Sequence, residues 1–317
     1  MTFFSILCAL LIEQLKPLRA GNPIYTGIRA LATRMENWFN AGQARHGRLG
    51  WWVMMASLMA PTAIIYWVCR EISPMAALGW NILIVYLTLG LRHYSHYFTS
   101  IQLALSAGDE ATARNLLAEW TKQDTAAMDV SEISRVAVER ALITVHRNVF
   151  GVFFWFLMPL GPACAVMYRV AEYLARAWNE PDHMKNEAFG RFAEQAFYWI
   201  DWIPVRLTAV AFAVVGNFED AVYAWRNFAD RWPDESIGII LSAGGGAMGV
   251  RLGTPLVNAA ITPADASELE PNDNEADTPP GEESTARALQ STVGLVWRAL
   301  LLWMLLLLLL SIAVWFG

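Results

Sequence analysis

The longest apolar runs of this 317-residue chain restrict what it can fold into. Nineteen residues from Trp51 to Cys69 carry no charge, and the run from Gly294 to Phe316 carries only Arg298. A helix needs about 20 apolar residues to cross the hydrocarbon core of a bilayer, so both runs predict transmembrane helices. We therefore expect an all-α polytopic membrane protein with about four to five transmembrane helices and a cytoplasmic helical insert.

The composition supports this class and excludes others. Hydrophobic residues make up 56% of the chain and charged residues 16%, which leaves too little polar material to surround a soluble core of this size. Strands of a membrane barrel alternate apolar and polar residues, whereas the long segments here are continuously apolar. The net charge of −6 speaks against nucleic acid as a partner. Three cysteines without Cys-x-x-Cys spacing predict neither a disulfide framework nor a metal site.

Three more helical segments are expected around the first span, two before it and one after it. Met1–Leu15 lacks the basic start and the small residues of a cleaved signal peptide, so we expect an uncleaved helix. The segment from Ile24 to Asn40 has apolar residues at helical spacing and predicts a helix along the membrane surface. Met75–Leu91 follows a tight turn after Cys69 and predicts a transmembrane hairpin with the first span.

The later apolar segments leave alternatives open. Val149–Tyr168 is interrupted by Pro159, Gly161 and Pro162. It is either one kinked span, which we favour, or a re-entrant pair of half-helices. Val205–Val215 is short for a crossing and carries Arg206, which favours a buried helix over a lone lipid-facing span.

Charge predicts the topology and the domain boundaries. Six Lys or Arg and one acid lie between Lys16 and Arg48, so this loop and the soluble insert at 92–148 are expected in the cytoplasm of a bacterial inner-membrane, multi-pass protein. Within the insert, Gly108–Asp109 breaks a helix and Asp129 with Glu132 predicts a capping box. Residues 1–261 form the membrane domain. Residues 262–292, with eight acids and four prolines, predict a disordered linker before a C-terminal transmembrane helix at 293–317.

A charged helix face leads directly into the interrupted apolar segment. Arg135, Glu139 and His146 stand at i, i+4 and i+11, which places them on one side of a helix. Arg147 and Asn148 follow at once, and the apolar run begins at Val149. This side of the helix is expected to meet the membrane surface.

Four motifs, in this order and spacing, resemble one known family. They read RHYSHYFTSIQLALSAGDEATARNLL, QDTAAMDVSEISRVAVE, WIDWIPVRLTAVAFAV and GAMGVRLG. Together they are similar to the CbiB/CobD family of cobalamin-biosynthesis membrane proteins, and the likeness extends to about Gly253. The resemblance implies an adenosylcobinamide-phosphate synthase, which joins adenosylcobyric acid to an aminopropanol phosphate through an amide bond. The corrinoid and the aminopropanol phosphate would be substrates and the lipid bilayer a partner; cofactor and oligomeric state are left unassigned.

The related AmpE branch is resembled as well, so the alternative is a non-enzymatic inner-membrane regulatory or signalling protein. Where the cobalamin enzymes show the acidic stretch Glu-Asn-Thr-Val-Asp-Gly, residues 146–151 of this chain read HRNVFG, without either carboxylate. The family's early acid is matched by Glu13. The missing acids favour the regulator, whereas the retained Asp124, Arg206 and Arg251 favour the enzyme.

Amide formation on an anionic phosphate substrate needs cations that hold the phosphate and a base that frees the amine. Because the family's acids are absent, Glu139 and His146 are the candidates for the base, and Asp124 completes the expected catalytic group. The expected substrate-binding residues carry cationic or hydrogen-bonding side chains: Arg206, Arg251, Arg147, Asn148 and Thr125.

Several of these residues also have purely structural interpretations. Arg135 with Glu139 is also typical of an i, i+4 surface pair, and Asp124 with Thr125 of a helix cap. The segment SAGGGAMGVRLG is either a phosphate-cradling loop, although it lacks the lysine and hydroxyl residue of a P-loop, or a flexible turn. Arg92, His93 and His96 either bind phosphate or metal or mark the interface end of a span.

Arg206 needs an anion because a guanidinium stays charged at membrane depth. The expected partners are the carboxylates of Glu139 or Asp124, or a substrate phosphate held against Arg251 and Arg147.

Overall fold

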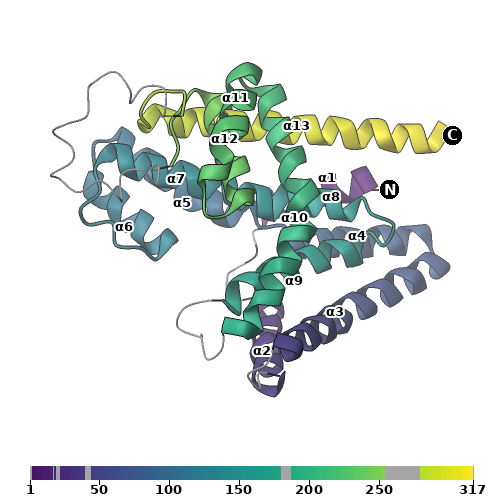
Figure 1. Ribbon diagram of the computed structural model, residues 1–317. Coiled ribbons are helices and arrows are strands. Elements are labelled where there is room, and N and C mark those ends of the chain that lie inside the picture. Colours follow the sequence, from purple (N-terminus) through teal and green to yellow (C-terminus); the bar gives the residue numbers. More distant parts are fainter. Residues whose placement is uncertain are drawn as a thin grey trace. The chain divides into compact units, whose positions relative to one another are not determined.

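The computed structural model in Figure 1 describes residues 2–16, 18, 22–39, 44–179, 187–253 and 279–316. Within these ranges every regular element is a helix, and one isolated backbone pairing joins Val250 to Glu282. This confirms the expected all-α class. The chain divides into two compact units, the first made of residues 1–93, 147–204 and 304–317, the second of residues 94–146 and 205–303. Each unit is described by itself.

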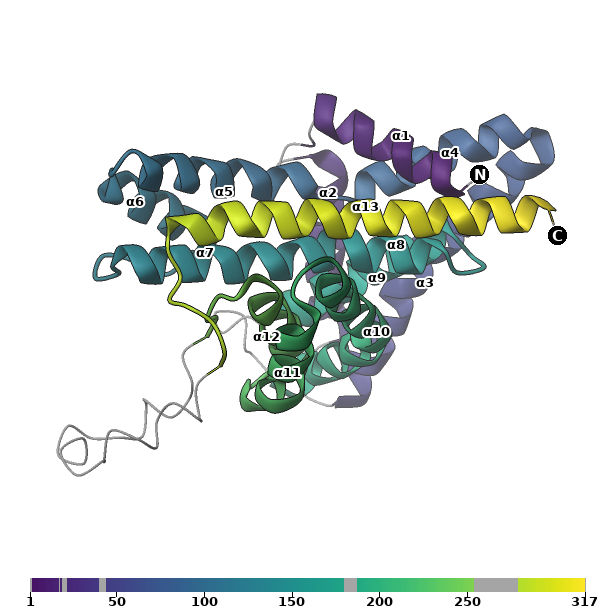
Figure 2. The ribbon, with the colours of Figure 1, turned by 90° about the horizontal axis from the view of Figure 1, so that it is seen from above.

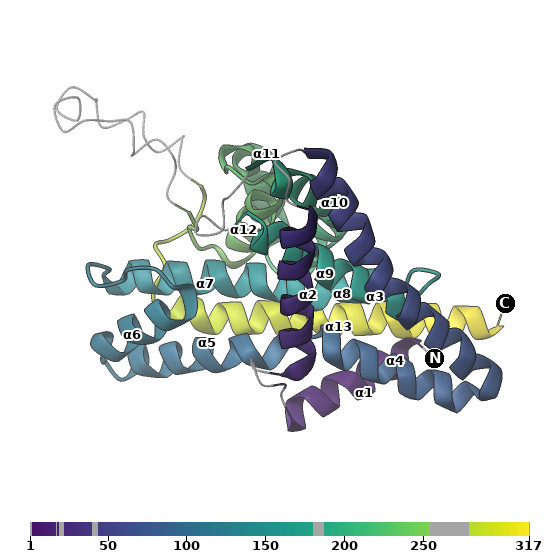
Figure 3. The same cartoon turned by 90° about the horizontal axis from the view of Figure 1, so that it is seen from below.

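The first unit begins with four helices: α1 (Thr2–Leu15), α2 (Pro23–Phe39), α3 (Ala44–Ile72) and α4 (Pro74–Thr88). Helices α3 and α4 form the expected hairpin, with α1 beside α4 and α2 beside α3 (Figures 2 and 3). The hairpin turn is short because the Ser73 side chain accepts a hydrogen bond from the Met75 N–H and Pro74 occupies the first helical position. Across the hairpin, Trp80 Nε1 donates to the Thr62 carbonyl oxygen at 3.2 Å.

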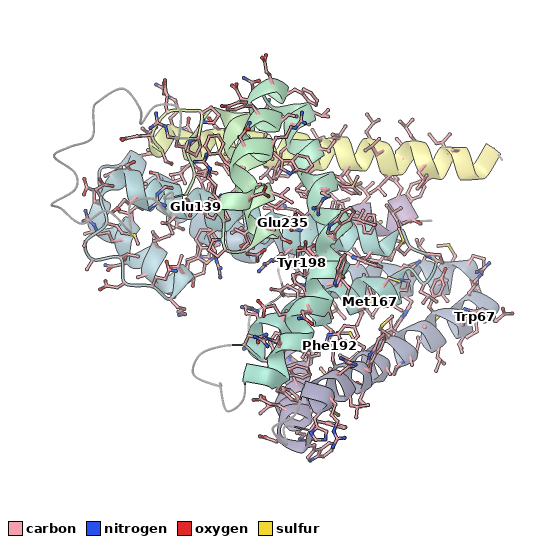
Figure 4. All side chains as sticks on the ribbon, in the orientation of Figure 1. Trp67, Glu139, Met167, Phe192, Tyr198 and Glu235 are labelled. Carbon is pink, nitrogen blue, oxygen red and sulfur yellow. The ribbon has the colours of Figure 1, made fainter. Side chains whose placement is uncertain are left out.

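Three helices are long and apolar enough to cross a membrane, over Arg45–Ile72, Phe189–Val215 and Ala286–Ala313. The first and last confirm the spans expected around Trp51–Cys69 and Gly294–Phe316. Helices α1 and α4 are apolar but shorter. Of the four to five expected spans, the one at Val149–Tyr168 is not among these helices, whereas Phe189–Val215 was not expected as a span. Large apolar side chains cover the outside of α3, among them Trp67, which points away from the helix bundle in Figure 4 and is 64% exposed. Exposed apolar side chains along a helix of this length indicate that the helix contacts lipid, as in a membrane protein.

The segment Val205–Val215 was expected to be too short for a crossing, but these residues continue helix α10 (Glu187–Val215), which is long and apolar enough to cross. Pro204 lies inside α10, where it has no N–H to offer the carbonyl oxygen of Ile200 one turn earlier. Trp155 Nε1 donates to that oxygen at 3.2 Å. The hydrogen bond lost at the proline is thus replaced by a side chain from another helix, and α10 continues.

The interrupted segment after residue 145 is a helical hairpin and not the kinked span we favoured. It consists of a π-helix η1 (His146–Phe150), α8 (Gly151–Phe156) and α9 (Pro162–Ala177). A side chain at Gly151 would collide with the Tyr168 ring, so the two positions are in contact. In one continuous helix, residues 17 positions apart would be about 25 Å apart. Gly161, at φ +44°, lies in the turn between α8 and α9, which matches the alternative of two half-helices.

The second unit contains the helical insert, formed by most of α5 (Leu91–Ser106) together with α6 (Glu110–Thr121) and α7 (Val130–Val145). The predicted break is confirmed, since Asp109 caps α6 by accepting from the Thr112 N–H. The predicted capping box is confirmed too. The Asp129 side chain accepts from the Glu132 N–H at 2.7 Å, and the Glu132 carboxylate accepts from the Asp129 N–H.

The glycine-rich segment is neither a loop nor a flexible turn over most of its length. It forms the end of α12 (Glu235–Met248), which packs against α11 (Phe218–Phe228); the short 3₁₀ helix η3 (Ala229–Arg231) lies between them in the chain. A Cβ at Gly246 would lie 2.7 Å from the carbonyl carbon of Asp220, so glycine is what lets the two helix backbones approach. Helix α12 ends at Gly249, whose φ of +67° is the left-handed conformation that glycine adopts readily.

The C-terminal helix α13 spans Ala286–Phe316 and contributes to both units. It begins earlier than residue 293, where the linker was expected to end. Before it, the Glu282 backbone accepts from the Arg251 N–H at 2.8 Å and donates to the Gly249 carbonyl oxygen at 2.9 Å. Residues 254–278, which contain most of the predicted linker, lie outside the described residues.

Candidate functional site

The Glu139 side chain projects from α7 (Figure 4), and only one of its two carboxylate oxygens has polar partners among the described residues. Its Oε1 accepts a hydrogen bond from the Gly253 N–H at 2.7 Å and lies 3.4 Å from Arg135 Nη1. Its Oε2 has no hydrogen-bond partner within the described ranges, and 17% of the side chain is exposed. The i, i+4 pair with Arg135 therefore exists, but Glu139 also anchors a backbone segment more than 100 residues away. One oxygen is left for a ligand.

Burial raises the pKa of Glu139, because a charged carboxylate loses hydration inside the unit. The positive charge of Arg135 and the Gly253 hydrogen bond act in the opposite direction without cancelling the effect on this pKa. A carboxylate whose pKa is raised binds a proton more readily than an ordinary Glu side chain, which is the direction that a general base requires.

His146 is almost completely buried, at 2% exposure, and its Nδ1 lies 2.9 Å from the Thr208 hydroxyl. This contact connects the end of α7 to α10 inside the second unit. The hydroxyl fixes the orientation of the imidazole ring, so His146 has a defined structural role in addition to the catalytic role expected of it.

Arg206 pairs with a carboxylate that we did not expect. Its Nη2 lies 2.8 Å from Glu235 Oε1, at the start of α12, and not beside Glu139 or Asp124. The two side chains are 27% and 39% exposed, so this ion pair is partly hydrated and one face of it is open to solvent. The expectation that Arg206 requires an anion is met, but the predicted protein partners are wrong.

Arg251 has an exposed side chain whose Nε donates to the Gly281 carbonyl oxygen at 2.8 Å. Together with the pairing of Val250 and Glu282, this bond fixes the chain on either side of residues 254–278. Among the described contacts, Arg251 joins neither Arg206 nor Arg147.

Asp124 and Thr125 lie apart from these residues, in a cavity of about 310 Å³ on α6 that Arg114, Asn115 and Gln123 also line. Asp124 accepts from the Ala126 N–H at 3.0 Å, which is the capping role weighed as an alternative. The Thr125 hydroxyl is buried and donates to the Arg114 carbonyl oxygen at 2.9 Å. Both residues have a local structural role, and the cavity is lined by polar groups.

In the first unit, Asn148 is part of a cluster that the sequence did not reveal. Arg169 Nη1 donates to Asn148 Oδ1 at 2.6 Å, lies 3.4 Å from the Arg147 carbonyl oxygen and lies 3.5 Å from Glu172 Oε2. Glu172 also lies 3.7 Å from Arg176. The π-helix explains part of this arrangement, because its wider turn frees backbone carbonyls and such bulges often occur at functional sites.

Two more polar contacts involve η1, α9 and α10. Arg147 stacks on the Phe197 ring at 5.6 Å, and the Tyr168 hydroxyl donates to Asp201 Oδ1 at 2.9 Å. Asp201 is 1% exposed. The sequence could have drawn attention to Arg169, Glu172 and Asp201 as charged residues inside or beside apolar segments, which are costly to bury without a purpose.

Within the described ranges, no three His, Cys, Asp or Glu side chains gather in a way that could hold a metal ion. His96 lies 3.4 Å from the Ser100 hydroxyl, and the side chains of Arg92 and His93 lie outside the described residues.

Fold and site together define a class: a helical membrane protein with a helical insert, a carboxylate of raised pKa and arginines held by polar partners. Comparison with known proteins identifies the group within that class. The chain belongs to the CobD/Cbib family, whose family model matches residues 6–292. No solved structure matches the chain.

Three of the similar proteins carry the same name. The cobalamin biosynthesis protein CobD of Stutzerimonas stutzeri (strain A1501) is 31% identical over 314 residues, covering 96% of this chain and 97% of that protein. Proteins of the same name from Chromobacterium violaceum and Desulfotalea psychrophila are 31% and 28% identical. The first of these two alignments covers 63% of each chain, and the second covers 56% of this chain and 59% of the relative.

Proposed function

We propose that this CobD/Cbib protein acts in cobalamin biosynthesis as an adenosylcobinamide-phosphate synthase. It would join a corrinoid carboxyl group to the amine of an aminopropanol phosphate. The family match over most of the chain and the name shared by the relatives support the pathway. We place the protein in a bacterial inner membrane, with several crossings and the insert in the cytoplasm.

The observation that carries the chemistry is the open oxygen of Glu139. An alkylammonium group has a pKa near 10, so it must lose a proton before its nitrogen can attack a carboxyl carbon. As the C–N bond forms, the bond from that carbon to its oxygen breaks. The oxygen leaves as phosphate once a nucleoside triphosphate has phosphorylated the carboxylate, so the proposed reaction requires a nucleoside triphosphate as co-substrate. Glu139 is our candidate for the proton acceptor, because burial raises its pKa and its Oε2 has no hydrogen-bond partner in the described part of the chain.

The test is complementation of a bacterial strain that lacks its cobinamide-phosphate synthase. The full chain should restore corrinoid-dependent growth, with the amide product measured by mass spectrometry. Glu139→Gln should reduce product formation by about 10²–10⁴-fold, the usual contribution of a general base. Glu219→Gln is the control, because Glu219 is an exposed carboxylate of the same unit.

Two results would contradict the proposal at different levels. If the parent reaches the membrane at normal levels but makes no product, the synthase is ruled out and the AmpE-like regulator becomes the better interpretation. If the parent works and Glu139→Gln works equally well, the synthase stands but Glu139 is not its base.

A further inference from the structure

Among the described residues, Arg169 makes its polar contacts through only one guanidinium nitrogen, Nη1. All three of its polar contacts, to Asn148 Oδ1, the Arg147 carbonyl oxygen and Glu172, involve Nη1. Nε and Nη2 have no hydrogen-bond partner in the described part of the chain, and the side chain is 22% exposed. A guanidinium group that is anchored at one corner and open along one edge is already oriented for a ligand.

The open edge has a specific geometry. Nε and Nη2 carry two parallel N–H groups, the fork that binds two oxygens of a phosphate or carboxylate at once. Because Nη1 is fixed by Asn148 at 2.6 Å, the fork loses little conformational freedom when a ligand binds.

Asn148 adds donors at the same place. Its Oδ1 accepts from Arg169, whereas its Nδ2 has no hydrogen-bond partner among the described residues. Gly90, between α4 and α5, leaves room for this amide, since a Cβ at Gly90 would lie 3.2 Å from Asn148 Nδ2. Two neighbouring side chains therefore present unused N–H groups, as an anion requires.

The surrounding charges favour a ligand with two ends of opposite sign. Glu172 is already shared between Arg169 and Arg176. Burial raises the pKa of Tyr25, the Arg169 charge opposes this shift and the Glu13 charge adds to it, so a cation and a carboxylate act on one hydroxyl. Because the Glu172 carboxylate lies 3.5 Å from Arg169 Nη1, a phosphate that carries an ammonium group on a short chain is repelled less at this place than a plain polyanion is.

We propose that Arg169 and Asn148 bind the phosphate of an aminoalkyl phosphate; the choice of this ligand rests on the proposed function. The same phosphate and ammonium chemistry occurs in two sources, a free aminoalkyl phosphate and the headgroup of phosphatidylethanolamine. The experiment must therefore separate them.

The test uses the full chain in phosphatidylcholine nanodiscs, titrated with O-phosphoethanolamine by calorimetry. The parent should bind it, and inorganic phosphate should bind more weakly. Arg169→Lys keeps the charge but removes the fork, so it should weaken binding about tenfold while the Tm stays close to that of the parent. Asn148→Leu, of similar size without donors, should also weaken binding. Arg176→Gln is the control on the same helix, with a side chain 60% exposed, and should bind like the parent.

Equal binding by the parent, Arg169→Lys and Asn148→Leu would overturn the site. If only nanodiscs that contain phosphatidylethanolamine stabilise the parent and the free ligand shows no binding, the site is a lipid site and the assignment to a substrate is overturned. Failure of the proposed function would give a different result. In that case the parent makes no amide product, although its binding of O-phosphoethanolamine still depends on Arg169. Conversely, a parent that makes product and an Arg169→Lys variant with unchanged KM for the aminoalkyl phosphate would remove the site and keep the function.

Discussion

Burial and hydrogen bonding shift the pKa of Glu139 in opposite directions. The Gly253 N–H and Arg135 favour the carboxylate, whereas loss of hydration favours the protonated form and prevails in raising the pKa. A folded-state pKa above the unfolded value means that the folded protein binds more protons than the unfolded one over the interval between the two values. The contribution of Glu139 to stability is therefore present below the unfolded pKa and is lost as pH rises through the folded pKa.

This sign gives a prediction for Glu139→Gln. Glutamine keeps an oxygen for the Gly253 N–H but does not titrate, so the variant should lack this pH dependence. The Tm of the parent in detergent should fall relative to that of Glu139→Gln as pH rises from about 4.3, the unperturbed value for Glu, toward neutrality. Thermal melts at several pH values measure this. A difference in Tm that stays constant with pH, or one that changes in the opposite direction, would show that burial does not govern this carboxyl group.

Sequence reasoning found Glu139 because helix spacing is local, but it could not find the Gly253 contact, which joins residues 114 positions apart. The same limit applies to Arg206. Its need for an anion follows from its charge, whereas the choice of Glu235 depends on how α10 packs against the start of α12. In the sequence Arg169 stands out only as a charged residue beside an apolar segment. The unused edge of its guanidinium group depends on the contacts that Nη1 makes in the fold.

Among the helices, α8 and α10 depend on each other through Pro204. The proline leaves the Ile200 carbonyl oxygen without a backbone donor, and Trp155 supplies one at 3.2 Å. Trp155→Phe keeps an aromatic ring but removes the N–H, which should cost about 1 kcal/mol and lower the Tm by about 2–4 °C. In a Pro204→Ala background the same substitution should cost half as much or less, because an alanine at this position has a backbone N–H that can donate to the Ile200 carbonyl oxygen.

Thermal melts of the parent, both single variants and the double variant complete this cycle. Trp199→Phe is the control, since Trp199 lies on α10 and is 71% exposed. Equal costs of Trp155→Phe in both backgrounds would mean that the indole does not replace the missing N–H.

The pattern of correct and wrong element predictions follows from the range of the interactions. The capping box at Asp129 and the break at Asp109 depend on residues within three positions, so the sequence predicted both. Helix α10 was divided at Pro204 because the compensating donor is far away in the sequence. The hairpin of α8 and α9 was misjudged because proline and glycine indicate an interruption but not the direction that the chain then takes.

For the whole molecule, composition and hydrophobic runs were sufficient to predict a helical membrane protein, since these properties are summed over many residues. Topology is the prediction that remains to be measured. A periplasm-active reporter fused after Glu119 should stay silent, because the insert follows the α3–α4 hairpin and a basic N-terminal loop. The same reporter fused after Ile72, at the far end of α3, should be active. Signals with the opposite pattern would invert the proposed orientation.

The pairing of Val250 with Glu282 brings together two points of the backbone that are 32 residues apart in the sequence. The bonds of Gly249 and Arg251 to Glu282 hold the described residues on the two sides of 254–278 together. Each doubling of a loop between fixed ends costs only about 0.6 kcal/mol of closure entropy. The free energy of closure between these two points therefore changes little with the number of residues that join them, whereas the Val250–Glu282 pairing fixes where the joining chain must begin and end.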